Sequence, residues 1–108
     1  MILDEKYVLH IPLAKFEDGK ISAVNIDGIL DELIESLNSR DVNSYYILHA
    51  DGFYKSRKFP QLLLKVFAPS DVDIGEIFAC WFLKNNHVLC QEAFAYEKSG
   101  KMIVKVIE

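Results

Sequence analysis

The stretch that decides the fold is LLLKVFAPSDVDIGEIFACWFLKN, residues 62–85. Its first seven residues are apolar except for one lysine, which is typical of a buried β-strand. Pro69 stops the strand, Ser70 can cap a helix, and Asp73 stands at the capping-box position. The next apolar residues recur at helical spacing and predict a helix over Asp71–Asn85, closed by a left-handed turn at Asn85-Asn86. Its apolar stripe comprises Ile74, Ile77, Phe78, Trp81 and Phe82, with Trp81 expected to be buried against the sheet.

The segments on either side extend this alternation of strand and helix. Apolar patterns predict further strands over residues 7–16, 45–54, 89–96 and 101–107, and a helix over 27–39 with Asp27 as its cap. The order is therefore β-α-β-β-α-β with one more strand. It predicts an α+β fold, a ferredoxin-like (split β-α-β) two-layer sandwich. In that architecture an antiparallel sheet carries two helices on one face, here with an extra C-terminal strand.

Short turns are predicted where glycine lies beside polar residues. Asp18-Gly19 predicts a hairpin that folds residues 20–24 back, and Lys98-Ser99-Gly100 predicts the turn of the closing hairpin. Asp51-Gly52 leaves two alternatives: a tight hairpin turn, or a bulge in one long strand that turns at Phe59-Pro60-Gln61. We favour the bulge, because residues 55–58 are too polar for a central strand.

The composition indicates one domain over residues 1–108, with 51% hydrophobic and 26% charged residues. So much apolar content in a short chain predicts an apolar surface, which a second copy most often covers. The net charge of −4 argues against nucleic acid as a partner. No apolar stretch approaches the roughly 20 residues of a membrane span. The N-terminus is acidic, and Cys80 and Cys90 lack redox or zinc spacing. We therefore expect a cytoplasmic protein with no metal, cofactor or membrane segment.

Two helices on one side leave the other face of the sheet uncovered. In the second strand we favour Tyr45, Ile47 and His49 as the residues on this helix-free face, rather than Tyr46, Leu48 and Ala50. Such a face is too apolar to remain exposed to solvent. We expect a second copy of the chain to cover it, in a homodimer, rather than the face to line a ligand cavity. The remaining outward residues are predicted to be His10, Leu63, Lys65, Phe67, Ile103, Lys105 and Ile107. The residues facing the helices are predicted to be Leu9, Ile11, Leu62, Leu64, Val66, Val104 and Val106.

The candidate ligand-binding site on that face consists of His10, His49 and Lys65, with Tyr45 or Tyr54 nearby. An imidazole titrates near neutral pH and can act as a general base, while a lysine can hold an anion. No motif connects these residues, so solvated or interface positions are the simpler interpretation. The predicted function is a small binding or regulatory module, homodimeric through the open sheet face, that binds a small anionic ligand or a protein partner.

Two other functions remain as alternatives, and whether the chain is an enzyme stays open. One is a small cofactor-free enzyme with His10 or His49 as its acid or base. The other is a weak single-stranded RNA binder that uses the aromatic and basic residues 53–59, which lack the Gly-aromatic-Gly pattern of RNA-recognition motifs. His87 and Cys90 lie three residues apart, and we interpret them as turn and core residues rather than a catalytic or metal-binding pair.

Overall fold

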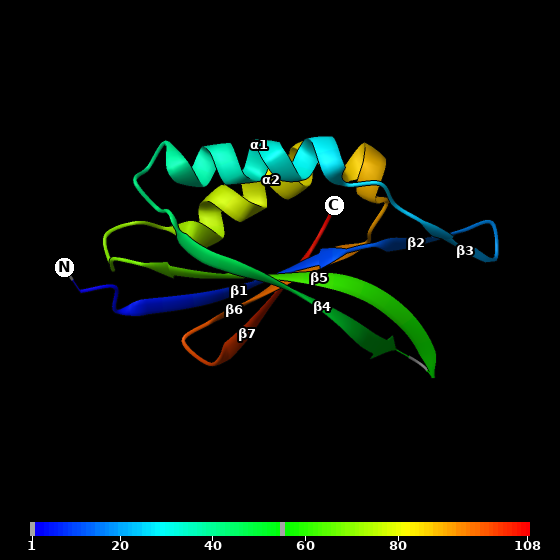
Figure 1. Ribbon diagram of the computed structural model, residues 1–108. Helices are drawn as coiled ribbons and strands as arrows, with labels where there is room; N and C mark the ends of the chain where they lie inside the picture. The colour runs from blue at the N-terminus through cyan, green and yellow to red at the C-terminus, as the bar shows by residue number, and fades with distance from the viewer. Residues whose placement is uncertain (1, 55) are drawn as a thin grey trace.

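The computed structural model describes residues 2–54 and 56–108, with only the backbone of Tyr54. The first strand is followed by a small hairpin and a helix, and the second helix lies between two larger hairpins (Figure 1). The elements in chain order are β1 (Glu5–Pro12), β2 (Ala14–Glu17), β3 (Lys20–Ala23), α1 (Asp27–Asn38), β4 (Ser44–Tyr54), β5 (Arg57–Ala68), α2 (Ile74–Leu89), β6 (Ala93–Lys98) and β7 (Lys101–Val106).

The main sheet has the strand order β4-β5-β1-β6-β7, and every neighbouring pair is antiparallel. Figure 1 shows α1 and α2 together on one face of this sheet, with the β2-β3 hairpin extending beyond its end. The predicted ferredoxin-like α+β sandwich is therefore confirmed, and β7 is the extra C-terminal strand. Within the described residues, no helix is long and apolar enough to cross a bilayer.

The core lies between the helices and the sheet. Phe78 of α2 is fully buried and meets the rings of Phe82 and Phe94 edge-on, at centroid distances of 5.7 and 5.8 Å. Trp81 is buried as predicted, but at the contact between the helices, where its indole N–H donates to the Ile29 carbonyl at 2.7 Å. This bond fixes α2 against the first turn of α1.

The start of α2 differs from the prediction. The N-cap is Asp73 rather than Ser70, and its carboxylate accepts a hydrogen bond from the backbone N–H of Glu76 at 3.1 Å. The helix also extends to Leu89, past the predicted end at Asn85. It stops at Cys90, which adopts a left-handed conformation with φ of 53°. The capping-box aspartate thus acts as the cap itself.

The predicted cap of α1 is also displaced by one residue. Asp27 is the first residue of the helix, and the N-cap position is taken by Ile26, whose side chain cannot accept a hydrogen bond. The side chain of Asn25 accepts from the backbone N–H of Asp27 at 3.1 Å. An upstream asparagine therefore satisfies one of the free N–H groups at the start of the helix.

The long β4-β5 hairpin corrects both alternatives for Asp51-Gly52. β4 runs straight through Gly52, which pairs with Phe59 in an unbroken register that ends at Tyr54 opposite Arg57. The connection therefore lies between Tyr54 and Arg57, where Ser56 has a φ of 61°; Lys55 is outside the described residues. The closing hairpin turns through two residues, Ser99-Gly100, both with positive φ. The Asp18-Gly19 turn is confirmed.

These turn lengths decide which side chains face the helices. Directly paired residues in an antiparallel ladder share a face, and a shift of one residue exchanges the faces. Leu64 faces the core and pairs with Ile47, so Tyr45, Ile47 and His49 lie on the helix side, opposite to the prediction. The same reasoning corrects β7. Its helix-free residues are Met102, Val104 and Val106, while Ile103, Lys105 and Ile107 were wrongly expected there.

Candidate functional site

The helix-free face of the sheet is broad and largely apolar. Its outer parts are exposed: Tyr46 is 46% and Leu48 43% accessible on β4, and Val104 62% and Val106 74% accessible on β7. The strands between them carry partly or fully buried side chains. We call this surface the open face. Its apolar members are Val8, Tyr46, Leu48, Leu63, Phe67, Met102, Val104 and Val106.

A histidine–carboxylate pair lies near the middle of the open face. Nε2 of His10 donates to Oε2 of Glu97 at 2.8 Å, and both side chains are partly buried. His10 stands on β1 and Glu97 on the neighbouring β6, two positions apart along the ladder and on the same face. A carboxylate that accepts from one ring nitrogen fixes the orientation of the imidazole and leaves the other nitrogen available to a ligand.

An aromatic and basic group lies on the β4 side of the same face. The rings of Tyr46 and Phe67 stack with a centroid distance of 6.3 Å. The ammonium of Lys65 lies 5.6 Å from the centre of the Tyr46 ring. This geometry is within the range of a cation–π contact. Lys65 is therefore directed toward β4 and away from the histidine–carboxylate pair on β1 and β6.

The predicted site residues are only partly brought together. His10 and Lys65 lie on the open face as expected. Tyr45 and His49 lie on the helix side, so the expectation that both histidines line one site on the open face is wrong. The side chain of Tyr54 lies outside the described part of the chain. The enzyme alternative thereby loses its second imidazole on the open face.

Glu97 is the residue that the sequence did not indicate as a partner of His10. It lies 87 residues away in the chain, and no spacing rule connects the two. The available signal was the β-α-β-β-α-β order, because this topology places the first and last core strands side by side. A polar residue on the outward face of the last core strand is therefore the natural partner of one on the first.

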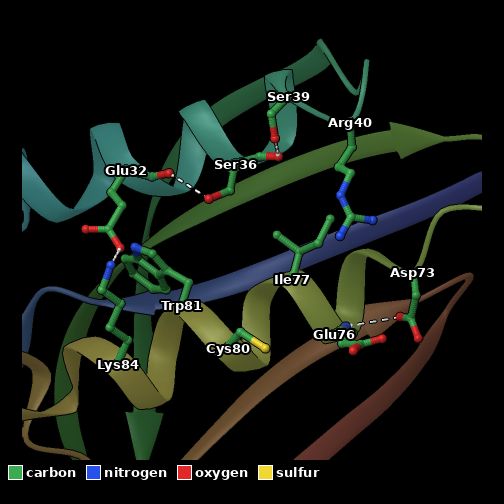
Figure 2. Close-up of a pocket in the computed structure, with 10 residues that line it drawn as sticks. All are labelled: Glu32, Ser36, Ser39, Arg40, Asp73, Glu76, Ile77, Cys80, Trp81 and Lys84. Carbon is green, nitrogen blue, oxygen red and sulfur yellow. Dashed lines mark hydrogen bonds and ion pairs between the residues drawn. The ribbon is translucent and has the colours of Figure 1, made fainter.

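A concave region lies on the outer side of the helices, away from the open face. The groove between α1 and α2 encloses about 360 Å³ and is lined by Ile77, Cys80 and Trp81 together with polar side chains. Figure 2 shows Glu32 and Lys84 at one end, joined by an ion pair of 2.8 Å. Arg40, Asp73 and Glu76 lie at the other end. We call this region the interhelix groove.

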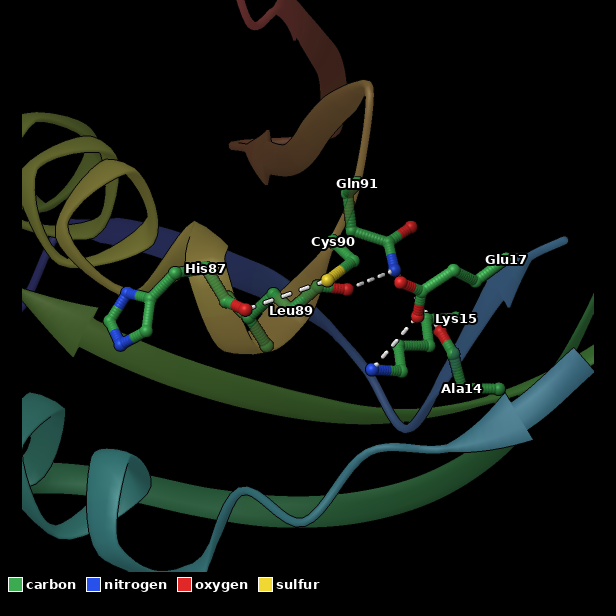
Figure 3. Close-up of polar contacts among 7 residues, drawn as sticks. All are labelled: Ala14, Lys15, Glu17, His87, Leu89, Cys90 and Gln91. Carbon is green, nitrogen blue, oxygen red and sulfur yellow. Dashed lines mark hydrogen bonds and ion pairs between the residues drawn. The ribbon is translucent and has the colours of Figure 1, made fainter.

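The end of α2 does not form a Cys/His site. The thiol of Cys90 lies 3.6 Å from the backbone carbonyl oxygen of His87, whose ring points away in Figure 3. Lys15 on β2 forms an ion pair with Glu17 at 3.1 Å, and this carboxylate raises the pKa of the Lys15 ammonium. In residues 2–54 and 56–108, no three His, Cys, Asp or Glu side chains gather in a way that could hold a metal ion.

The RNA alternative can be followed only at part of residues 53–59, because Lys55 and the Tyr54 side chain lie outside the described part of the chain. Arg57 and Lys58 are consecutive strand residues and point to opposite faces of the hairpin. The Arg57 guanidinium stacks on the Phe16 ring at 4.8 Å, and Lys58 pairs with Asp51 at 3.5 Å. Phe53 is exposed. Arg57 and Lys58, however, do not form a continuous basic stripe beside it, because their side chains point to opposite faces.

Comparison with known proteins shows a similar fold. No family model matches the chain, and no curated protein matches it. Among solved structures, it is similar to a phage SAM lyase in the apo state, with a TM-score of 0.66 and 11% identity. It is also similar to a phage SAM lyase in complex with S-methyl-5′-thioadenosine, with a TM-score of 0.66 and 8% identity. Both matches cover 96% of this chain and 90% of the other. At these identities the likeness concerns the fold.

Proposed function

We propose that this protein is a small binding module that acts as a homodimer through the open face. The observation that carries the proposal is the exposure of Tyr46, Leu48, Val104 and Val106 on one side of a sheet whose other side is covered by helices. Tyr46 and Leu48 lie on one edge strand and Val104 and Val106 on the other, with the less exposed apolar side chains of Val8, Leu63 and Phe67 between them. Large exposed apolar patches on small proteins mark interaction sites. Two-fold pairing of identical surfaces is the commonest assembly of soluble chains.

The composition of the open face suits such an interface. Each half-exposed side chain that becomes fully buried contributes about 1 kcal/mol to association. The aromatic ring of Tyr46 supplies a large contact area, and aromatic residues are enriched in protein interfaces. The Glu97 carboxylate already accepts a hydrogen bond from His10, so a partner that covers this pair leaves that hydrogen bond in place.

Matched substitutions of exposed leucines test the homodimer. Leu48 lies on the open face, whereas Leu83 lies on α2 and is 54% accessible. Leu48→Glu places an unpaired carboxylate in the proposed interface and should weaken association at least about tenfold. Leu83→Glu introduces the same charge away from the interface and should leave association unchanged. Sedimentation velocity over a concentration series measures both, and equal effects of the two substitutions would refute the assignment of the interface.

A second candidate function is the binding of a nucleoside thioether on the open face. It is supported by the likeness to a phage SAM lyase in complex with S-methyl-5′-thioadenosine. The Tyr46 and Phe67 rings offer a surface on which a purine base can stack, with the Lys65 ammonium beside it.

Titration with S-methyl-5′-thioadenosine, followed by two-dimensional NMR, tests this second function. Saturable shifts should gather at Tyr46, Lys65 and Phe67, and Tyr46→Ala should weaken the binding. Phe16→Ala removes an exposed aromatic ring from the β2-β3 hairpin and serves as the control. Absence of saturable shifts, or equal weakening by both substitutions, would contradict this function.

A further inference from the structure

The interhelix groove carries charges of both signs that form no ion pair among the described residues, although Asp73 also caps α2 through one carboxylate oxygen. Arg40 at the end of α1 extends its guanidinium over Ile77 of α2, and Asp73 and Glu76 lie at the same end of the groove (Figure 2). The ion pairs formed among residues 2–54 and 56–108 include none of these three side chains. A cation and two carboxylates thus border the same space without direct pairing.

The rest of the groove limits what can enter it. The Glu32–Lys84 ion pair neutralises the far end. Ile77 and the buried Trp81 contribute apolar surface to the lining. A volume of about 360 Å³ lies at the small end of the 300–1,000 Å³ typical of ligand pockets. This volume suits a small molecule.

We propose that the interhelix groove binds a free α-amino acid with an apolar side chain. The ligand carboxylate would bind the Arg40 guanidinium, which suits planar carboxylates in a bidentate geometry. The ligand ammonium would bind the carboxylates of Asp73 and Glu76, and the apolar side chain would contact Ile77 and Trp81. The acidic side chains of the groove outnumber the basic ones, which disfavours a purely anionic ligand. This site is separate from the open face and does not depend on the homodimer.

Trp81 provides a direct probe of the groove, because it is the single tryptophan of the sequence. L-leucine should change its fluorescence with a saturable dependence on concentration. N-acetyl-L-leucine lacks the ammonium and L-leucinamide lacks the carboxylate, so each should bind about tenfold more weakly or worse, as expected for the loss of a charged hydrogen bond. Arg40→Gln should weaken leucine binding by a similar factor. Arg57→Gln, on the distant β4-β5 hairpin, should not.

The thiol of Cys80 gives a second readout, since it is exposed and lines the groove (Figure 2). Leucine should slow its alkylation by iodoacetamide in the wild type and not in Arg40→Gln. Circular dichroism of Arg40→Gln establishes that the variant is folded. The proposal is overturned if leucine produces no saturable fluorescence change at concentrations up to about 100 mM. This is about 100 times the Kd of roughly 1 mM that is typical of a weak ligand. It is equally overturned if leucine and its two derivatives bind alike, or if Arg40→Gln binds leucine as the wild type does.

Discussion

Two glycines in the helices make a matched pair for testing the packing of α2 on the sheet. Gly75 lies in the first turn of α2, under the Tyr96 ring of β6. A Cβ atom built on Gly75 would overlap the Tyr96 hydroxyl and lie 2.7 Å from Cζ and 3.0 Å from Cε2. Gly28, in the first turn of α1, has nothing within 4 Å of the corresponding position.

The expected magnitude follows from these distances. Carbon atoms pack best at about 3.5–4.0 Å, so Gly75→Ala requires a movement of roughly 1 Å between α2 and a buried ring. Overpacking of this kind costs about 1–3 kcal/mol, against a gain of about 0.5–1 kcal/mol from replacing glycine in a helix. Gly75→Ala should therefore destabilise the fold by up to about 2.5 kcal/mol. Gly28→Ala has only the gain and should stabilise it by up to about 1 kcal/mol.

Urea denaturation of the two variants and the wild type measures both changes. Each 1 kcal/mol corresponds to a shift of about 4–8 °C in Tm for a domain of this size, so thermal unfolding provides a second estimate. Tyr96→Phe removes the atom nearest to the new methyl group and should recover part of the loss in Gly75→Ala. If Gly75→Ala stabilises the protein as Gly28→Ala does, α2 does not pack on Tyr96 as described.

Three further outcomes follow from the core and the cysteines. Trp81→Ala should lower the free energy of unfolding by about 3–5 kcal/mol, measured by denaturation, because a buried indole is lost; a change below about 1 kcal/mol would contradict its burial. Burial, with a contribution from Asp73, raises the pKa of Tyr96 in the folded state. The associated stability is therefore present below the ordinary tyrosine pKa of about 10 and is lost as pH rises through the folded value. In Tyr96→Phe the free energy of unfolding should fall less between about pH 10 and higher pH than it does in the wild type. The same dependence on pH in both proteins would contradict this. Cys80 should react with a thiol reagent before Cys90 in mass spectrometry of the native protein, and the reverse order would contradict their exposures.

The sequence was sufficient for the order of the core elements because each one carries its own signal. The strand predicted over residues 7–16, however, is divided into β1 of the main sheet and β2 of a separate two-stranded sheet. The apolar run of β5 ends at Pro69, and α2 begins at a capping-box residue, so strand and helix could be located without knowledge of the fold. The topology then followed from few alternatives, since sequential strands and helices connect in limited ways. The helix ends were less well defined, because neighbouring polar residues such as Ser70 and Asp73 compete for the same cap.

The faces of the two outer strands could not be derived in the same way. A three-residue turn at Phe59-Pro60-Gln61 would pair even-numbered residues with even-numbered ones and odd with odd. The observed register pairs Tyr54 with Arg57, an even-numbered residue with an odd-numbered one. The turn at Ser99-Gly100 has the same effect on β7. Each change of one residue in a turn exchanged the faces of a whole strand, which separated His49 from His10 and placed Val104 on the open face.

The partners within each candidate site depended on contacts between distant segments. Glu97 meets His10 only because β6 lies beside β1. Arg40 and Glu76 share the interhelix groove because α1 and α2 are packed together. Neither pair of residues has a characteristic spacing in the sequence from which the contact could be predicted.

The measurement that tests the central proposal most directly is the molar mass of the wild-type protein by light scattering across a dilution series. We predict the mass of two chains at micromolar concentration, and a return to one chain when Leu48→Glu is measured under the same conditions. A wild-type mass of one chain throughout the series would contradict the homodimer, and with it the role proposed for the open face.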